Sequence, residues 1–262
     1  MARSNPLPGP TPLVVAHRGA SVDQPENTLP SFEAAIGAGA DVVELDVRLS
    51  ADGVAVVMHD PDVSRATDGH GFVHEMPLPE LKRLDASRGK GPRTEVATLR
   101  EVLDLVSGRA GADLEIKNIP GEPAFDSPTE AVLQAALREL DAASFSGDVI
   151  ISSFNIITIE RSLTLAPDLP TGFLTVGAIE PSAALAYARG AGHAWVLPSV
   201  DALLRAGKAF VDEAHGAGIR VGTWTVDDQN SLATLFGWGV DAVASNDPEL
   251  AVRVRDGVTR SL

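Results

Sequence analysis

The sequence predicts an α/β protein with a closed (β/α)8 TIM barrel. Eight short apolar segments, of the kind that form buried parallel strands, alternate with amphipathic segments of helical period. The length of 262 residues fits the roughly 250 residues typical of this barrel. An open doubly wound sheet is the alternative, but the chain has no G-x-G-x-x-G turn of the dinucleotide-binding type.

The eight expected barrel strands are apolar runs bounded by turn residues. They lie at 13–16, 42–47, 113–117, 149–153, 171–175, 194–198, 220–226 and 241–245. The first helix is expected to begin after the capping residue Thr28 and to end near Gly37 and Gly39. The other helices are expected at 99–106, after Ser127-Pro128, at 156–165, 182–189, 203–217 and 231–238, and after Asp247-Pro248.

An additional strand at 54–58 is predicted to fold back on the second barrel strand. Asp52-Gly53 is a strong turn signal, and so short a connection permits only an antiparallel partner. This hairpin would bring an imidazole close to two carboxylates. The expected pairs are Val54 with Leu49, Val56 with Val47, and His59 with Glu44.

The segment at about 61–97 is polar and rich in glycine and proline. So long an irregular passage is more typical of a small inserted subdomain or lid than of a simple loop. We therefore expect one catalytic barrel domain over 1–262, with an insertion after the second barrel strand.

The composition disfavours several classes of binding partner and any integral association with a membrane. The formal net charge of −15 disfavours nucleic acid and anionic membranes. The chain has no cysteine, Met1 to Pro12 has no apolar run of signal-peptide length, and no stretch approaches the roughly 18 apolar residues of a membrane span. We expect a cytoplasmic protein without integral membrane association; the oligomeric state does not follow from the sequence.

Polar side chains gather at the predicted carboxyl ends of the strands, where TIM-barrel enzymes place their sites. They are His17, Arg18, Glu44, Asp46, Glu115, Lys117, Ser152, Ser153, Trp224 and Asn246, and the hairpin adds His59.

This set indicates phosphoryl-transfer chemistry. The carboxylates Glu44, Asp46 and Glu115 would repel one another unless a hard divalent cation such as Mg²⁺ or Ca²⁺ lay between them. Imidazoles suit general acid and base roles near neutral pH, and Arg18 and Lys117 can hold an oxyanion.

Structural roles explain several other residues better than catalytic roles do. His70, His74, His193 and His215 fall in loops or at helix ends, and Ser152 and Ser153 lack the G-x-S-x-G elbow of a nucleophile. Trp224 fits core packing and a pocket wall equally well.

The motifs resemble those of the glycerophosphodiester phosphodiesterases, within the superfamily of phospholipase-C-like phosphodiesterases, over almost the whole chain. They are His17-Arg18-Gly19, Pro25-Glu26-Asn27-Thr28, Glu44-Leu45-Asp46, Asp52-Gly53, His59-Asp60, the run from Arg65 to Gly71, the run from Leu81 to Asp85, Glu115-Ile116-Lys117, Ser153-Phe154, Trp224-Thr225-Val226 and Asn246-Asp247-Pro248. Ala66, Ala97 and Ser245 depart from the family's usual Thr, Pro and Thr, which affects only local loops and substrate fit.

The resemblance implies metal-dependent hydrolysis of glycerophosphodiesters to sn-glycerol 3-phosphate and an alcohol. It further implies a role for each site residue. Which histidine is the base and which the acid does not follow from the sequence; we favour His17 as base and His59 as acid. The implied roles are catalysis by His17 and His59, metal binding by Glu44, Asp46 and Glu115, substrate binding by Arg18, Lys117 and Trp224, and support by Glu26 and Asn27.

Two alternatives stay open. A lysophospholipase D or phospholipase-C-like enzyme acting on acylated substrates would be favoured by an exposed apolar rim around the barrel mouth. A non-catalytic barrel that binds glycerophosphodiesters would be expected to lack a histidine or a metal ligand, and none is missing.

Overall fold

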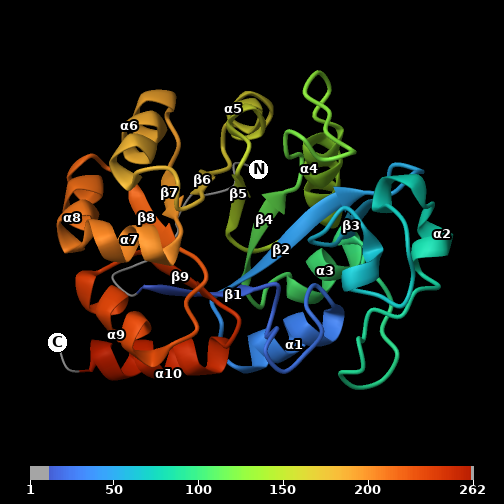
Figure 1. Cartoon of the computed structure of the whole chain (residues 1–262), viewed down its shortest axis with the longest axis horizontal. Helices are drawn as coiled ribbons and strands as arrows, with labels where there is room; N and C mark the ends of the chain where they lie inside the picture. Colours follow the sequence, from blue (N-terminus) through green and yellow to red (C-terminus); the bar gives the residue numbers. More distant parts are fainter. Residues whose placement is uncertain (1–11, 261–262) are drawn as a thin grey trace.

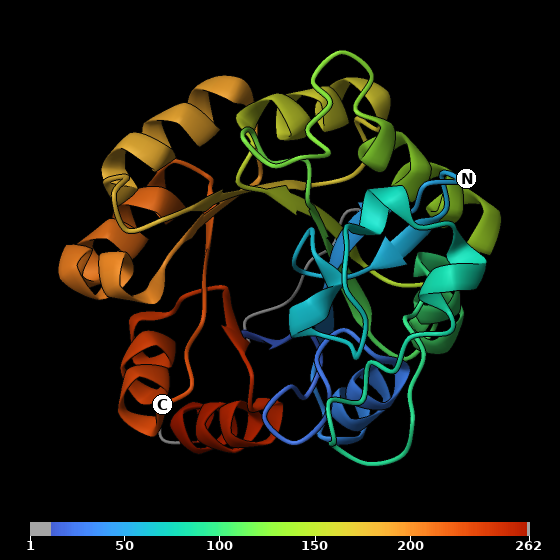
Figure 2. The same ribbon diagram turned by 45° about the vertical axis from the view of Figure 1, so that its right-hand side comes forward.

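The computed structural model describes residues 12–260. Eight parallel strands close into a barrel, because β1 pairs with both β9 and β2, and β3 adds to β2 as an antiparallel extension. Helices surround the strands as an outer ring (Figure 1 and Figure 2). The predicted fold class is confirmed. Residues Met1 to Thr11, where we expected no leader sequence, lie outside the described residues.

The strands match the predicted segments within two residues at each end, except that β8 ends at Thr223 and not at the predicted Val226. They are β1 (Leu13–His17), β2 (Val42–Leu49), β3 (Ala55–Val57), β4 (Gly111–Ile116), β5 (Val149–Ser153), β6 (Thr171–Thr175), β7 (Trp195–Pro198), β8 (Arg220–Thr223) and β9 (Ala242–Ser245).

The helices follow the strands in alternation. They are α1 (Leu29–Gly37), α2 (Leu78–Leu81), α3 (Leu99–Val106), α4 (Ala131–Ala143), α5 (Ile156–Leu165), α6 (Pro181–Ala191), α7 (Val200–Ala206), α8 (Lys208–Gly216), α9 (Gln229–Trp238) and α10 (Pro248–Thr259). No helix among residues 12–260 is long and apolar enough to cross a membrane.

The alternation of side chains between the two faces of β2 explains why carboxylates lie inside the barrel. Val43, Leu45 and Val47 pack outward against the helices in a large apolar cluster, while Val42 joins the apolar interior of the barrel. Glu44 and Asp46 share the inward face with Val42, one and two steps closer to the carboxyl end of β2. Both carboxylates are therefore buried inside the barrel mouth.

The predicted hairpin forms, but its predicted register is wrong by one residue. The observed pairs are Val47 with Val57, Arg48 with Val56, and Leu49 with Ala55. The Ser50 N–H donates to the Val54 carbonyl, so the loop contains three residues rather than four, and Gly53 adopts φ 78°. His59 therefore does not pair with Glu44, and it reaches the site beyond the end of β3.

Two predicted helices also differ from the structure. The segment 203–217 contains the end of α7 and all of α8, because Gly207 interrupts the helical path at φ 76° and ψ 179°. Helix α4 begins at Ala131 instead of after Ser127-Pro128, and Asp126 accepts hydrogen bonds from the N–H groups of Thr129 and Ala131 in the preceding turn.

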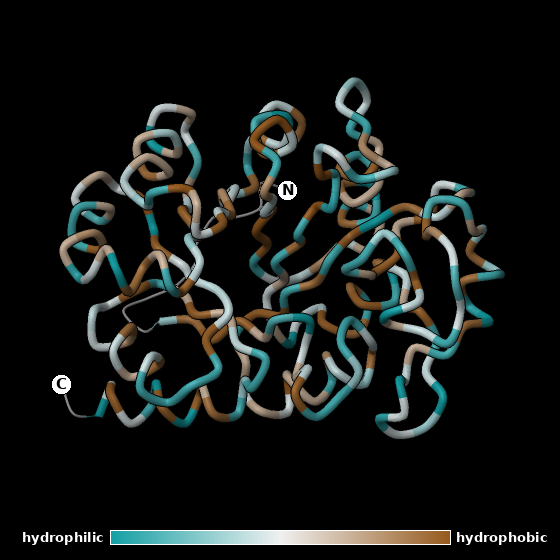
Figure 3. The backbone as a smooth tube through the Cα atoms, in the orientation of Figure 1, coloured by the Kyte–Doolittle hydropathy of each residue, from teal (hydrophilic) through white to brown (hydrophobic). Residues whose placement is uncertain are grey.

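The segment between β3 and α3 contains α2 and two short 3-10 turns, Val63–Arg65 and Val73–Glu75. It extends from the barrel at the right of Figure 1, and polar residues dominate its outer edge in Figure 3. It has a small apolar core of its own that continues from Val56 and Met58 of the hairpin through Val63, Val73 and Leu81.

Candidate active site

Three carboxylates converge from two neighbouring strands. Asp46 of β2 pairs in register with Glu115 of β4, and Glu44 lies one inward position before Asp46. One ligand oxygen from each of Glu44, Asp46 and Glu115 lies within 4.8 Å of the others, and all three side chains are buried. Glu44 Oε1 and Asp46 Oδ1 have no hydrogen-bond partner. Buried carboxylate oxygens that accept no hydrogen bond fit, in this arrangement, the hard donor set of a divalent cation.

Two basic side chains offset part of this negative charge. Lys117 Nζ lies 2.7 Å from Glu115 Oε1 and 3.4 Å from Asp46 Oδ1. Arg18 Nε lies 3.2 Å from Asp46 Oδ2, and the Arg18 backbone N–H donates to Glu44 Oε2 at 2.8 Å. The site therefore combines opposite charges in a small, buried volume.

The carboxyl groups differ strongly in acidity. Burial, then repulsion by Asp46, raises the pKa of Glu44 well above its usual value. Burial raises the pKa of Glu115 to about 7, although Lys117 opposes that shift. Burial also tends to raise the pKa of Asp46, but the positive charges of Lys117 and Arg18 outweigh burial and hold this pKa below its usual range. Asp46 is thus the most persistent negative charge of the cluster.

His17, at the end of β1, has its ring fixed by an amide. Its Nδ1 lies 2.8 Å from Asn246 Oδ1. Asn246 Nδ2 donates to Asp227 Oδ2 at 2.7 Å, which identifies Asn246 Oδ1 as the acceptor facing His17. Nδ1 of His17 therefore carries the proton and Nε2 keeps its lone pair. Burial and the neighbouring Arg18 charge lower the pKa of His17 to about 4.

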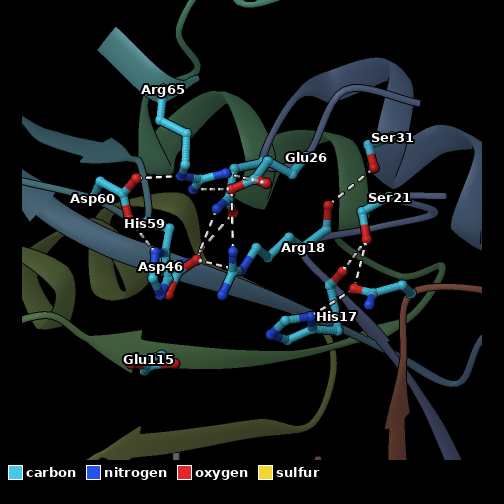
Figure 4. Close-up of polar contacts among 12 residues, drawn as sticks. His17, Arg18, Ser21, Glu26, Ser31, Asp46, His59, Asp60, Arg65 and Glu115 are labelled. Carbon is cyan, nitrogen blue, oxygen red and sulfur yellow. Dashed lines mark hydrogen bonds and ion pairs between the residues drawn. The ribbon is translucent and has the colours of Figure 1, made fainter. Parts of the chain in front are cut away.

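His59 has a carboxylate partner instead. Its Nδ1 lies 2.6 Å from Asp60 Oδ1, and Asp60 also pairs with Arg65. Burial and the charges of Lys117 and Arg18 lower the pKa of His59, while the charge of Asp46 and the hydrogen bond to Asp60 oppose this. In Figure 4, His59 and His17 lie on opposite sides of the Arg18 guanidinium. The backbone carbonyl of His59 accepts two hydrogen bonds from the buried Arg48.

Glu26 and Asn27 contact the charged groups of the site. Asn27 Nδ2 donates to Asp46 Oδ2 at 2.8 Å. Glu26 accepts from two guanidinium nitrogens of Arg65 and lies 3.2 Å from Arg18 Nη1 (Figure 4). Glu26 belongs to this ion-pair network and lies outside the carboxylate cluster found among residues 12–260.

A cavity of about 220 Å³ opens over these groups. His17, Arg18, Glu44, His59 and Glu115 form its polar part, whereas Asp46 and Lys117 are not in its lining. Its other wall is apolar and includes Trp224, whose ring packs edge-on against Phe154 at 5.2 Å between centroids. Trp224 Nε1 donates to the Leu197 carbonyl, so Trp224 combines a packing role with a place in the wall.

Sequence reasoning missed several partners of the expected site residues. Asp227 and Arg48 belong to no motif of their own, whereas Arg65 begins the motif that runs to Gly71 but was given no role in the site. The adjacency of His59 and Asp60 is the one signal in the sequence that could have indicated an imidazole–carboxylate pair. Asp113, one inward position before Glu115, also lines the cavity and accepts from Ser152 Oγ at 2.7 Å. His193 and His215 bond to Thr171 and Asp241 in other parts of the fold.

Comparison with known proteins agrees with this geometry. The profile of the glycerophosphoryl diester phosphodiesterase family matches residues 17–250. The chain belongs to this family. The resemblance predicted from the motifs is thereby confirmed.

Relatives of this phosphodiesterase family align over nearly the whole chain. A glycerophosphodiester phosphodiesterase from Caldanaerobacter subterraneus is 35% identical over 94% of this chain and 98% of its own. A glycerophosphodiester phosphodiesterase from Bacillus subtilis is 33% identical over 94% of this chain and 87% of its own. A phosphodiesterase from Oleispira antarctica, solved in complex with the product sn-glycerol-3-phosphate, is 31% identical, covers 94% of this chain and 97% of its own, and gives a TM-score of 0.83.

Proposed function

We propose that this chain hydrolyses glycerophosphodiesters to sn-glycerol 3-phosphate and an alcohol in a reaction that depends on a divalent metal, Mg²⁺ or Ca²⁺. The observation that carries the proposal is the convergence of three buried carboxylates with two imidazoles on one cavity. The family membership and the relative solved with sn-glycerol-3-phosphate support the same substrate class.

The carboxylates Glu44, Asp46 and Glu115 would hold the metal. A bound divalent cation would neutralise their charge and lower the pKa of a hydroxyl or water that it coordinates. Repulsion by Asp46 contributes to the raised pKa values of Glu44 and Glu115, and a cation between the three carboxylates would remove that repulsion. Metal binding would require Glu44 and Glu115 to be ionised and would release the protons they hold.

The histidines would divide the proton transfers. His17, neutral and with Nε2 unprotonated, is suited to take a proton from the attacking oxygen, either the glycerol 2-hydroxyl or water. His59, whose Nδ1 is held by Asp60, is suited to protonate the departing alcohol. If the 2-hydroxyl attacks, the resulting cyclic phosphate is opened by water with the two roles exchanged.

The basic residues and the aromatic wall would position the substrate. Arg18 lines the cavity and can contact the phosphate directly, whereas Lys117 lies behind Glu115 and acts on the phosphate through its charge. Trp224 would contact the less polar part of the substrate.

The test is release of sn-glycerol 3-phosphate from glycerophosphocholine, glycerophosphoethanolamine and glycerophosphoglycerol, first with EDTA and then with Mg²⁺ or Ca²⁺ restored. We expect turnover only with metal, and a loss of about 10²-fold or more in kcat for His17→Ala and for His59→Ala. Wild-type turnover in EDTA, or near-normal turnover in both histidine variants, would contradict the proposal.

A further inference from the structure

Arg48 is a buried charge that the proposed mechanism does not use. It follows Asp46 by one inward position on β2 and is only 3% exposed. A buried guanidinium is costly unless it is paired, so its partners indicate its role. Among residues 12–260, its only ion pair is with Glu122, and it pairs with none of the three clustered carboxylates. Arg48 is therefore not a counterion of the carboxylate cluster.

The guanidinium of Arg48 holds the backbone carbonyl of His59. Arg48 Nε donates to this carbonyl oxygen at 2.9 Å and Nη2 donates to it at 2.5 Å, so two arms of the fork converge on one atom. The ladder between β2 and β3 ends at Val57, and the Met58 N–H then donates to the Asp46 carbonyl. The fork is the next attachment along the chain, and it fixes the peptide of His59 where the ladder no longer does.

Glu122 holds the other side of the same guanidinium. Arg48 Nη1 donates to Glu122 Oε2 at 2.7 Å and Nη2 donates to Oε1 at 3.3 Å, which is the bidentate geometry of strong arginine–carboxylate pairs. A turn presents Glu122, because its N–H donates to the Ile119 carbonyl at 3.1 Å. The loop between β4 and α4, green in Figure 1, is thereby tied to the backbone of His59.

Arg48 does not contact the substrate cavity. The lining of that cavity includes His59 but does not include Arg48. A second cavity of about 220 Å³ borders Arg48 instead, with Leu49, His74 and Asp126 in its wall. Any effect of Arg48 on the reaction must therefore pass through the groups that it holds.

We propose that Arg48 is a positioning residue for His59: its guanidinium, oriented by Glu122, fixes the His59 peptide so that the imidazole reaches the departing alcohol. The inference rests on the proposed function, in which His59 protonates that alcohol. A displacement of about 1 Å can cost on the order of 10²-fold in rate, even when the change lies away from the reacting atoms. Loss of the fork should therefore lower kcat and leave substrate binding intact.

Two substrates with different leaving groups show which step depends on Arg48. With glycerophosphocholine, Arg48→Ala should lower kcat by about tenfold or more and leave KM within about twofold. With glycerol 3-(4-nitrophenyl phosphate), whose nitrophenolate leaves without being protonated, the same variant should lose much less of its kcat. An equal loss with both substrates would overturn the proposal. Release from neither substrate by the wild type would contradict the proposed function instead.

Chemical rescue separates positioning from a general loss of structure. Because Arg48 lines the second cavity, Arg48→Ala should open that cavity to a free guanidinium ion. Millimolar guanidinium should then raise the glycerophosphocholine turnover of Arg48→Ala severalfold, whereas ammonium should not, and the wild type should respond to neither. A folded Arg48→Ala protein that guanidinium does not reactivate would contradict the proposal.

A second variant keeps the proposal testable if Arg48→Ala does not fold. Glu122→Gln leaves the fork in place but removes the charge that orients it, so kcat for glycerophosphocholine should fall more than kcat for the nitrophenyl ester. The control is Glu33→Gln, which breaks a bidentate pair of the same form with Arg109 on the outside of the barrel and should leave both values unchanged. Wild-type kcat for glycerophosphocholine in Glu122→Gln would overturn the proposed orientation of Arg48.

Discussion

The two histidines of the site differ in the group that contacts Nδ1 of the imidazole ring. His17 faces the amide of Asn246, which Asp227 orients through two hydrogen bonds. His59 faces the carboxylate of Asp60, which stabilises an imidazolium. An amide acceptor fixes the tautomer without adding charge, so His17 stays neutral, whereas the Asp60 carboxylate opposes the lowering of the pKa of His59 by burial. This difference supports a base role for His17 and an acid role for His59.

The Asn246 contact gives a prediction about positioning. Asn246→Ala should lower kcat about tenfold with little change in KM, because the His17 ring loses its fixed orientation while the groups that bind substrate remain. Steady-state kinetics with glycerophosphocholine measures this. His215→Gln is the control, since His215 is exposed and bonded to Asp241 away from the cavity. An increase in KM alone would contradict the positioning role.

The raised pKa of Glu115 predicts a pH dependence of stability in the absence of metal. The folded-state pKa is about 7 against an ordinary value of 4.5, so the folded protein binds this proton more tightly than the unfolded chain. The corresponding stability is present below pH 4.5 and is lost as pH rises through about 7. Glu115→Gln, which stays neutral, should lose less stability over this range.

Urea denaturation in EDTA at several pH values measures that difference. The free energy of unfolding of Glu115→Gln minus that of the wild type should increase from pH 4.5 to about 7. Comparing the two proteins cancels the opposite contribution of His17, whose lowered pKa removes stability as the pH falls. A difference that stays constant across the range would contradict the assigned pKa shift.

At the scale of elements, the turn after β1 places Arg18 through a close backbone approach. Gly19 has φ 84°, and a Cβ on it would lie 2.2 Å from Ser31 Oγ, whose hydroxyl donates to the Arg18 carbonyl. Only glycine fits both the left-handed backbone and the contact with α1. The position of the Arg18 N–H on Glu44 therefore depends on this turn.

Two glycine variants separate backbone strain from the close contact. Gly53→Ala places a Cβ in open space at φ 78°, so it should cost about 1 kcal/mol of stability from the backbone alone. Gly19→Ala has similar backbone strain plus the clash with Ser31, so it should be destabilised further and should lose activity. Urea denaturation and the glycerophosphocholine assay measure both. Equal stability and activity in the two variants would show that the contact is not limiting.

Sequence patterns predicted some elements to the residue and others less well, for physical reasons. Helix α5 (Ile156–Leu165) and strand β5 (Val149–Ser153) match because turn residues bound continuous apolar patterns. The break at Gly207 was missed because the apolar pattern continues across it. The hairpin register was wrong because Asp52-Gly53 suits loops of either three or four residues, and a one-residue change reverses the face of each side chain.

The candidate site was predicted in part by the same logic. Side chains at strand ends must meet at the barrel mouth, and the structure brings Glu44, Asp46 and Glu115 together there. The catalytic and binding roles stay predictions. The partners Asp227, Arg48 and Arg65 could not be predicted, because their contacts depend on loop paths and side-chain conformations that no periodic pattern encodes.

At the scale of the whole molecule, the carboxylate cluster adds to a net charge of −15. Arg18 and Lys117 only partly neutralise Glu44, Asp46 and Glu115, and Glu44 Oε1 and Asp46 Oδ1 accept no hydrogen bond. A metal ion that binds only the folded state should therefore stabilise the entire barrel. The cluster joins β2 to β4, so its stability is coupled to closure of the sheet.

Thermal unfolding tests this coupling. At a metal concentration about 100-fold above Kd, the stabilisation is about 2.7 kcal/mol, which at roughly 2–4 °C per kcal/mol raises Tm by about 5–10 °C. Comparing Mg²⁺ with Ca²⁺ at equal concentrations identifies the preferred ion by the larger rise. Asp46→Asn should abolish the rise, whereas Asp104→Asn, which removes an exposed carboxylate on α3, should leave it unchanged. An equal rise in both variants would show that the metal stabilises the protein from a different place, and the carboxylate cluster would lose its assignment as the metal site.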